Sequence, residues 1–383
     1  MTADPIRVLL VDDQRLVNAA VATMLRPEKD LELRWCGEGS KALEVAREYK
    51  PQVILQDLVL PDADGLDIVT AMREDPFLRE IPLVVLSGKE EPAVKAEAFA
   101  RGANDYLVKL PAAVELIARI RHHAKGYLAL MERNAAYERL HAELGEAAAY
   151  VRSILPPVIS QPMSTAWKFY PSSSLGGDAF SYHQLDDDHF AIYLLDVCGH
   201  GVGSALLSVS ALNTLGARAL PDVDFLNPAK VLEALNNAFP MERQNQLYFT
   251  IWYGVYRIST RELTYAAAGH PPAVLLPPGR KPQLLQGEGL PIGTFEGLEY
   301  DMFSTFIPPG SHLYVFSDGV FEVECLDGSM LPFDDFVRIL TDLSHDDAEA
   351  RLSCIIESVQ EIQGKTAFDD DCSLVEFVFD GEL

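Results

Sequence analysis

Acidic motifs end hydrophobic runs in the second half of this chain of 383 residues. One such run, from Phe190 to Leu195, leads directly into Asp196. The four motifs are Gly176-Gly177-Asp178, Asp196-Val197-Cys198-Gly199-His200-Gly201, Ser317-Asp318-Gly319 and Asp369-Asp370-Asp371. If the runs are strands, the carboxylates converge at strand tips, where like charges so close together are stable only with a cation between them. The pattern predicts a binuclear metal site.

The composition is that of a soluble globular protein with room for two or three domains. Hydrophobic residues make up 48%, yet no apolar stretch approaches the roughly 20 residues that span a bilayer, and the N-terminus shows no signal-peptide pattern. We therefore expect a cytoplasmic protein with no membrane partner. The five cysteines lack the paired spacing of a zinc site, which suits free thiols. A formal net charge of -26 argues against nucleic acid as a partner.

The first 125 residues alternate short β-rich runs with amphipathic segments such as Ala42 to Tyr49 and Ala93 to Arg101. This alternation is typical of an α/β doubly wound five-stranded parallel sheet with helices on both faces. The expected strands are Arg7 to Val11, Leu31 to Cys36, Val53 to Gln56, Leu83 to Leu86 and Asp105 to Val108. We predict three parts: a domain over residues 1–125, a helical linker over 126–157 and a second domain over 158–383.

The linker carries a short heptad pattern. Leu130, Tyr137, Leu144 and Val151 repeat every seven residues, and Leu140, Ala147 and Ile154 form a second series. This pattern favours a marginal coiled coil, and with it a homodimer, although a helix packed along its own domain is an alternative. Pro156-Pro157 end the helix in either case.

Beyond Pro157, β-rich runs alternate with helical stretches near Ser204 to Ala219, Pro228 to Phe239 and Ala348 to Ile362. The runs Phe249 to Arg257 and Leu263 to Ala267 are separated by a short turn, which predicts antiparallel pairing. The sum is an α+β domain of packed layers.

Polar residues follow the strands of the first domain where functional groups gather in such sheets. Asp12, Asp13 and Asp57 offer three carboxylates to Mg2+. A phosphoryl group on Asp57 could meet that metal, the Lys109 ammonium and the Ser87 hydroxyl. The constellation predicts a phosphoacceptor site.

Residues 5 to 125 thereby resemble a two-component response-regulator receiver. The resemblance implies Asp57 as phosphoacceptor and a cognate histidine kinase as partner. It also implies that Asp13, Asp57 and the Val59 carbonyl bind Mg2+, with Asp12 acting mostly through water. Ser87 and Lys109 would sense phosphate, and Tyr106 would be the aromatic switch. Lys109-Leu110-Pro111 departs from the family, which usually places a cis proline directly after the lysine.

The second acidic constellation offers only oxygen ligands, which favours Mg2+ or Mn2+ over zinc. Two such metals would activate a bridging water and stabilise charge on a phosphoryl group, so phosphoester hydrolysis is the expected chemistry. Cys198 adjoins the Asp196 turn but lacks the Cys-x5-Arg loop of cysteine phosphatases, and we interpret it as a packed side chain.

These motifs, with Leu247-Tyr-Phe-Thr250, Ala268-Gly-His-Pro271 and Gly289-Leu-Pro-Ile-Gly293, resemble the PPM (PP2C-like) metal-dependent serine/threonine phosphatases, in the SpoIIE-type bacterial branch. The resemblance covers roughly residues 152 to 383. It implies two Mg2+ or Mn2+ ions and a phosphoserine or phosphothreonine substrate, possibly on an anti-sigma-factor antagonist. The residues that it assigns to the centre are Asp178, Asp196 with the Val197 carbonyl, Asp318, and Asp370 with Asp371 as the fallback.

Two other functions are consistent with parts of this sequence. Gly176-Gly177-Asp178-Ala179-Phe180 is similar to the signature of diguanylate cyclases, but Ala179 replaces an acidic residue that such a cyclase needs. The other alternative is a catalytically silent phosphatase-fold adaptor that binds a regulatory partner under receiver control. Because every expected aspartate is present, we favour an enzyme whose turnover responds to Asp57 phosphorylation through the linker.

Overall fold

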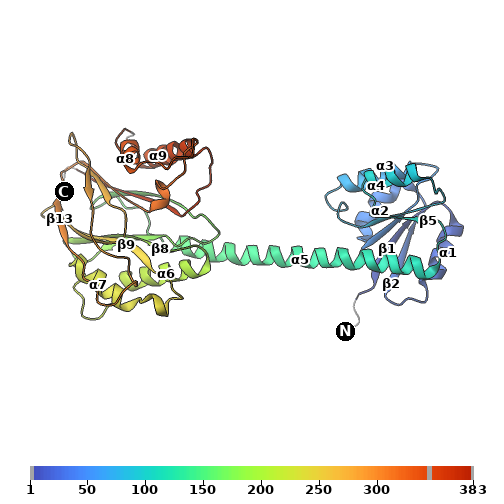
Figure 1. Cartoon of the computed structure of the whole chain (residues 1–383), viewed down its shortest axis with the longest axis horizontal. Coiled ribbons are helices and arrows are strands. Elements are labelled where there is room, and N and C mark those ends of the chain that lie inside the picture. Colours follow the sequence, from blue (N-terminus) through green and yellow to red (C-terminus); the bar gives the residue numbers. More distant parts are fainter. Residues whose placement is uncertain (1–3, 343–346, 381–383) are drawn as a thin grey trace. The chain divides into compact units, whose positions relative to one another are not determined.

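The computed structural model describes residues 4–342 and 347–380, and the chain forms two compact units (Figure 1). The first unit comprises Met1–His141 and the second comprises Ala142–Leu383. Each unit buries hydrophobic clusters of its own. Within the described ranges, no helix combines the length and the apolar character that crossing a membrane requires.

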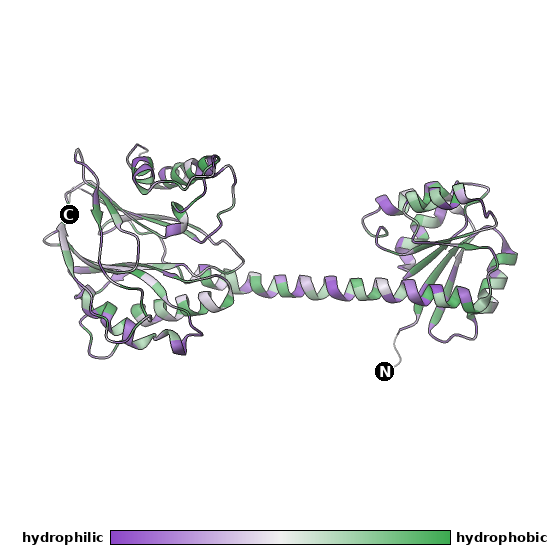
Figure 2. Ribbon diagram, viewed as in Figure 1, coloured by the Kyte–Doolittle hydropathy of each residue, from purple (hydrophilic) through white to green (hydrophobic). Residues whose placement is uncertain are grey.

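The first unit is built on a parallel sheet with strand order β2-β1-β3-β4-β5. Its strands are β1 (Ile6–Val11), β2 (Leu31–Cys36), β3 (Val53–Gln56), β4 (Leu83–Ser87) and β5 (Asp105–Val108). The surrounding helices are α1 (Arg15–Leu25), η1 (Gly39–Lys41), α2 (Ala42–Tyr49), α3 (Gly65–Glu74) and α4 (Pro92–Ala100). In β1, Leu9 and Val11 enter one core while Val8 and Leu10 enter the other, so the strand is hydrophobic on both faces from Val8 to Val11 (Figure 2). The predicted doubly wound sheet is confirmed.

One continuous helix, α5 (Ala113–Ser153), follows the sheet. At its beginning, Leu116 and Ile120 pack in the core of the first unit. At its end, Leu144 and Val151 pack in the second unit beside Ala205 of α6. The single helix predicted across this region is therefore present, and its two ends belong to different cores.

The second unit contains two five-stranded sheets, ordered β13-β10-β9-β8-β7 and β12-β11-β14-β15-β6. The first sheet comprises β7 (Ala179–Gln184), β8 (His189–Val197), β9 (Phe249–Arg257), β10 (Glu262–Ala268) and β13 (Phe303–Phe306). The second comprises β6 (Ser164–Tyr170), β11 (Ala273–Leu276), β12 (Gln283–Leu285), β14 (Ser311–Phe316) and β15 (Cys372–Phe379). The helices are α6 (Val202–Gly216), α7 (Pro228–Ala238), η2 (Met241–Arg243), η3 (Asp318–Val320), α8 (Phe333–Asp342) and α9 (Ala348–Gln363). The predicted pairing of β9 with β10 is antiparallel, as expected.

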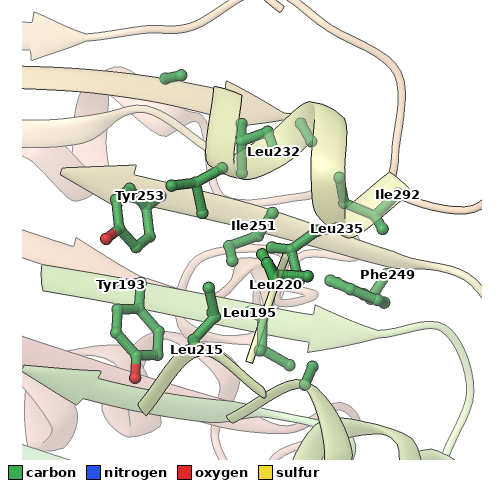
Figure 3. Close-up of a cluster of buried hydrophobic side chains, with 14 of the residues drawn as sticks. Tyr193, Leu195, Leu215, Leu220, Leu232, Leu235, Phe249, Ile251, Tyr253 and Ile292 are labelled. Atoms are coloured by element: carbon green, nitrogen blue, oxygen red, sulfur yellow. The ribbon is translucent and has the colours of Figure 1, made fainter. Parts of the chain in front are cut away.

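The two sheets pack face to face, and helices cover their outer faces. In β8, Ile192 and Leu194 point into the core between the sheets, whereas Tyr193 and Leu195 point into the core beneath α6 and α7 (Figure 3). A third core lies between the second sheet and helices α8 and α9. Because side chains alternate along a strand, Asp196 has the same orientation as Ile192 and Leu194. Its carboxylate therefore lies on the side of β8 that faces the other sheet, at the end of the strand.

Candidate functional site

The first acidic cluster forms where β1 and β3 end side by side. Asp12 and Asp57 are buried, Asp13 is half-buried, and ligand oxygens of the three lie within 4.8 Å of one another. One carboxylate oxygen of Asp13 is buried without a hydrogen-bond partner in the described part of the chain. The three predicted carboxylates are thus brought together with a geometry that fits a small divalent cation.

Lys109 neutralises part of this cluster. Its Nζ lies 2.6 Å from Oδ2 of Asp57 and 2.9 Å from Oδ2 of Asp12. Burial raises the pKa of Asp57, and the Lys109 ammonium opposes this shift. Burial alone would lower the pKa of Lys109, but the two carboxylates outweigh it and the pKa is raised. Lys109 is therefore held charged beside the predicted phosphoacceptor.

The remaining predicted receiver residues lie around this pocket. Ser87 is buried at the end of β4, and the Tyr106 hydroxyl donates a hydrogen bond to the Lys89 carbonyl at 2.6 Å. Val59 forms an isolated antiparallel bridge with Asp64 just after the phosphoacceptor strand. At the departure from the receiver pattern, the Lys109–Leu110 peptide is trans and Leu110 adopts a φ of 56°. A left-handed residue makes the turn in place of a cis proline.

The second acidic cluster forms at one end of the sheet pair. Asp178 immediately precedes β7 and Asp196 lies near the end of β8, where Ala179 pairs with Leu195. Asp318 follows β14, and the motif Asp369-Asp370-Asp371 precedes the neighbouring strand β15. Each sheet therefore contributes two adjacent chain segments to the cluster, as the sequence pattern predicts.

Burial and mutual repulsion dominate the electrostatics of this cluster. Asp178 is fully buried, and neither of its carboxylate oxygens makes a hydrogen bond of good geometry within the described residues. Burial raises its pKa well above the usual range, and Asp196 and Asp371 add to the shift. Burial, with repulsion from Asp318, Asp370 and Asp371, raises the pKa of Asp196 to about 7. Burial, with repulsion from Glu322 and Asp370, raises the pKa of Asp318 to about 6.

Asp370 and Asp371 have different surroundings. Asp371 is buried, and its Oδ1 accepts hydrogen bonds from the Ser172 backbone N–H at 2.7 Å and from the Ser172 hydroxyl at 3.0 Å. Its Oδ2 accepts a hydrogen bond from the Gly177 backbone N–H. Asp370 is exposed, and its Oδ1 accepts a hydrogen bond from the Asp371 backbone N–H at 2.8 Å. The geometry leaves Asp370 available to a cation and uses Asp371 to hold the segment that leads to Asp178.

Two glycines allow the backbones of this centre to approach closely. A Cβ on Gly177 would lie 2.6 Å from the Val197 carbonyl oxygen, and a Cβ on Gly319 would lie 2.2 Å from the Asp371 carbonyl oxygen. Both separations are shorter than any side chain tolerates, so a larger residue would move the chain that carries the carboxylates. These contacts explain why glycine occurs next to the aspartate in both motifs.

The two acidic clusters differ in spacing. Within residues 4–342 and 347–380, the first cluster is the one set of three His, Cys, Asp or Glu side chains whose ligand atoms lie within 4.8 Å of one another. No three ligand groups of the second cluster, among the described residues, meet this limit. Cys198 is half-buried, and its Sγ accepts a hydrogen bond from the Tyr248 backbone N–H at 3.3 Å.

Sequence reasoning missed two features near this cluster. Glu322 contributes to the raised pKa of Asp318, and its place after a short 3-10 turn gave no strand-end signal. His270 is buried, and its Nδ1 lies 2.8 Å from the Thr250 hydroxyl oxygen. Thr250 is the residue of β9 that lies directly opposite Asp196 of β8. The motif that contains His270 was noted, but only as a turn.

Comparison with known proteins identifies both units. The family described as Stage II sporulation protein E (SpoIIE) matches residues 186–379, which is about half of the chain. The chain belongs to the SpoIIE family. The response regulator receiver domain family matches residues 8–121, so this SpoIIE-family chain begins with a receiver domain.

Individual relatives cover the two parts separately. Phosphoserine phosphatase RsbP of Bacillus subtilis is 32% identical over 174 residues, which cover 44% of this chain and 42% of RsbP. DNA-binding response regulator MtrA of Mycolicibacterium smegmatis is 34% identical over 115 residues, 30% of this chain and 49% of MtrA. The chain thus spans about half the length, or less, of each of these relatives.

A solved structure agrees with the fold of the second unit. The SiaA-PP2C domain of Pseudomonas aeruginosa superimposes with a TM-score of 0.57 and 22% identity, and the match covers 64% of this chain and 99% of that domain. This likeness shows a PP2C-like fold for the SpoIIE-family part of the chain.

Proposed function

We propose that this protein is a response regulator whose output is metal-dependent hydrolysis of phosphoserine or phosphothreonine on a regulatory protein. The observation that carries the proposal is the Asp178 carboxylate. It is fully buried and makes no hydrogen bond of good geometry among the described residues, although the Ser317 and Ser373 hydroxyls lie nearby. It shares its cluster with Asp196, Asp318, Asp370 and Asp371. A buried ionised carboxylate without a partner is very costly, and a bound cation removes that cost. The donor set is made of oxygen atoms, which suits Mg2+ or Mn2+.

Within this proposal each residue has its own role. Asp196 faces the space between the sheets and would, with the Val197 carbonyl, hold the cations from the first sheet, while Asp318 and Asp370 would hold them from the second sheet. Asp178 supplies the buried negative charge behind them, and Asp371 holds its segment in place through Ser172 and Gly177. When bound, the cations lower the pKa of a water between them and stabilise charge on the phosphoryl group.

The substrate class rests on the relatives. RsbP is named a phosphoserine phosphatase, and it is 32% identical to this chain over 174 residues. We extend this to a phosphorylated serine or threonine of a protein, and to an anti-sigma-factor antagonist as the candidate substrate.

The receiver unit supplies the control. We propose that a cognate histidine kinase phosphorylates Asp57, with Asp12, Asp13 and the Val59 carbonyl holding Mg2+, and with Ser87, Lys109 and Tyr106 responding to the phosphoryl group. A modification that adds about -1.5 to -2 charge to a pocket already crowded with carboxylates can bias the arrangement of neighbouring elements. Because α5 begins in the receiver core and ends beside α6, it is the element through which we expect the signal to pass, with a homodimer formed along it.

The test is Mn2+-dependent hydrolysis of p-nitrophenyl phosphate and of a phosphoserine protein by the full chain. Asp318→Asn should abolish turnover, because it removes a ligand charge from the centre. Asp369→Asn is the matched control: its carboxylate is 77% exposed and pairs with Lys365, so turnover should be unchanged.

Two outcomes would contradict the proposal. Binding of a phosphorylated partner without turnover, at any phosphorylation state of Asp57, would favour the silent adaptor. Equal loss of activity in the Asp318 and Asp369 variants would mean that the effect is not specific to the centre.

A further inference from the structure

His270 is a buried histidine that the proposed chemistry does not use. It follows β10, after Gly269 turns the chain with a φ of 68°, and it is only 6% exposed. A Cβ on Gly269 would lie 2.7 Å from the Pro291 ring, so the turn requires glycine. The turn delivers the imidazole into the interior instead of into solvent.

The ring contacts the strand that lies beside Asp196. Its Nδ1 is 2.8 Å from the Thr250 hydroxyl oxygen, and Thr250 lies directly opposite Asp196 in the β8–β9 ladder. In β9, Trp252 points between the sheets, so the alternation gives Thr250 the same direction as Asp196 on its own strand. Directly opposed side chains lie about 5 Å apart at Cβ, so the Thr250 side chain is a neighbour of the Asp196 carboxylate.

The ring also lies near the other sheet. Burial lowers the pKa of His270 to about 3, and the backbone of Phe316, at the end of β14, opposes this shift only in part. Phe316 lies two residues before Asp318. His270 is thus next to a strand neighbour of one predicted ligand and next to the strand end that leads to another.

An imidazole in this position carries a free-energy cost that an apolar side chain would avoid. Its Nε2 is buried and makes no hydrogen bond of good geometry among the described residues, although the Phe316 backbone lies close enough to the ring to raise its pKa in part. A buried polar atom without a partner is unfavourable and calls for an explanation in terms of what the side chain does. The neutral ring is a poor candidate for proton transfer, which leaves its contact with Thr250 as its contribution.

We propose that His270 is a positioning residue for the metal centre: through Thr250 it fixes the Asp196 side chain of one sheet at the distance from Asp318 of the other sheet that two cations require. This role rests on the proposed metal-dependent function. Residues that orient metal ligands from behind typically change metal affinity by about 10- to 100-fold when they are altered.

The experiment compares Mn2+ binding to the full chain by isothermal titration calorimetry, with electron paramagnetic resonance of free Mn2+ as a second readout. His270→Phe and Thr250→Val should each weaken Mn2+ binding about tenfold, because each removes the same hydrogen bond. Thr250→Ser keeps a hydroxyl and should restore the affinity. The double variant should bind no more weakly than either single variant, since the two changes act on one contact.

His183→Phe is the matched control. His183 is also partly buried with an unpartnered Nε2, but it lies on the helix-facing side of β7, edge-on to Tyr193 at 5.8 Å. The same substitution there should leave Mn2+ affinity unchanged even if it lowers Tm. In turnover of p-nitrophenyl phosphate, His270→Phe should raise the Mn2+ concentration at half-maximal rate and recover most of kcat at saturating Mn2+.

Several results would overturn this role. They are a Mn2+ isotherm of His270→Phe that superimposes on that of the unaltered protein, an equal loss in His183→Phe, or additive losses in the double variant. If the unaltered protein binds no Mn2+, both the proposed metal centre and the positioning role of His270 are refuted. An unaltered protein that binds Mn2+ but hydrolyses no phosphoester would refute the proposed function alone, because the isotherms of the variants would still decide the role of His270.

Discussion

Without divalent cations, the second unit should become progressively less stable as the pH rises from about 4 to 7. The pKa values of Asp196 and Asp318 are raised to about 7 and about 6 in the folded, cation-free protein. A carboxyl whose folded pKa lies above its unfolded value stabilises the fold while it is protonated, and this stabilisation is lost as the pH rises through the folded pKa. The loss from each carboxyl should therefore build up between its unfolded pKa near 3.8 and its folded pKa, which is the range from about pH 4 to pH 7 for these two residues.

The size of this loss of stability can be worked out from Asp196. Its pKa moves from an ordinary 3.8 to about 7, and each pH unit corresponds to about 1.36 kcal/mol, so ionising it in the folded protein costs about 4 kcal/mol. Asp318 adds less to this free-energy cost than its own pKa shift implies, because the repulsion between Asp196 and Asp318 would otherwise be counted twice. For a unit of this size, about 1 kcal/mol changes Tm by about 2 to 4 °C, so Tm should fall by on the order of 10 °C.

The assay is differential scanning calorimetry of the full chain in EDTA and in Mn2+, at pH 5.5, 6.5 and 8. Mn2+ should remove the decline, since a bound cation keeps the carboxylates ionised at no cost in repulsion. Asp196→Asn identifies the transition that belongs to the second unit: it should raise that Tm in EDTA at pH 8 and abolish the response to Mn2+. A cation-free Tm that is constant from pH 5.5 to 8, or that falls in Asp196→Asn at pH 8, would refute the reasoning.

Asp370→Asn should weaken Mn2+ binding about tenfold at unchanged Tm, whereas Asp371→Asn should lower Tm because its carboxylate holds the Ser172 backbone. Titration calorimetry and thermal scans separate these effects, and identical profiles would contradict the division of roles. Arg351→Met should lower the free energy of unfolding in urea by about 3 kcal/mol. The substitution removes the guanidinium that lies 2.7 Å from the fully buried Glu376 carboxylate. An unchanged free energy of unfolding would argue against that ion pair. Lys109→Met should tighten Mg2+ binding to the receiver, because the Lys109 ammonium competes with the cation for the Asp12 and Asp57 carboxylates. Mg2+ binding can be monitored by tryptophan fluorescence, and weaker binding in the variant would show that the ammonium supports the cation instead.

The sequence was sufficient for the five strands of the first unit and for β8, β9 and β10, because each is a short apolar run with a clear end. In contrast, β6, β7, β11, β12 and β13 were not predicted. The run from Leu31 to Cys36 is β2 in the structure, and the run from Phe249 to Arg257 is β9. The same periodicity explains the orientation of Asp196: it is in phase with Ile192 and Leu194, which face the other sheet. Strand ends and alternation are local properties, so local sequence predicts them.

The different surroundings of Asp370 and Asp371 could not be found in this way, although the family resemblance had already placed Asp370 before Asp371 as a ligand. The two residues are adjacent and chemically identical, and they differ because Asp371 meets the backbone of Ser172, which lies 199 positions away in sequence. His270 was assigned to a turn for the same reason, since only the packed structure brings its ring to Thr250. Roles that depend on a long-range partner need the tertiary contact, which no local pattern contains.

The heptad pattern of α5 illustrates how a correct periodicity can serve two purposes. Tyr137 and Leu140 are 61% and 53% exposed, as a seam that awaits a partner helix would be. Leu144 and Val151 belong to the same periodic stripe, yet they pack beside Ala205 of α6 within the second unit. The last turns of the stripe are therefore already used, and only its middle is free for a second copy of the helix. A homodimer that used the whole stripe would have to displace the contact with α6, which begins directly after the Asp196 turn. If the chain pairs along α5, that pairing and the packing against α6 would compete for the same side chains, and the linker would then have two arrangements through which a receiver could act.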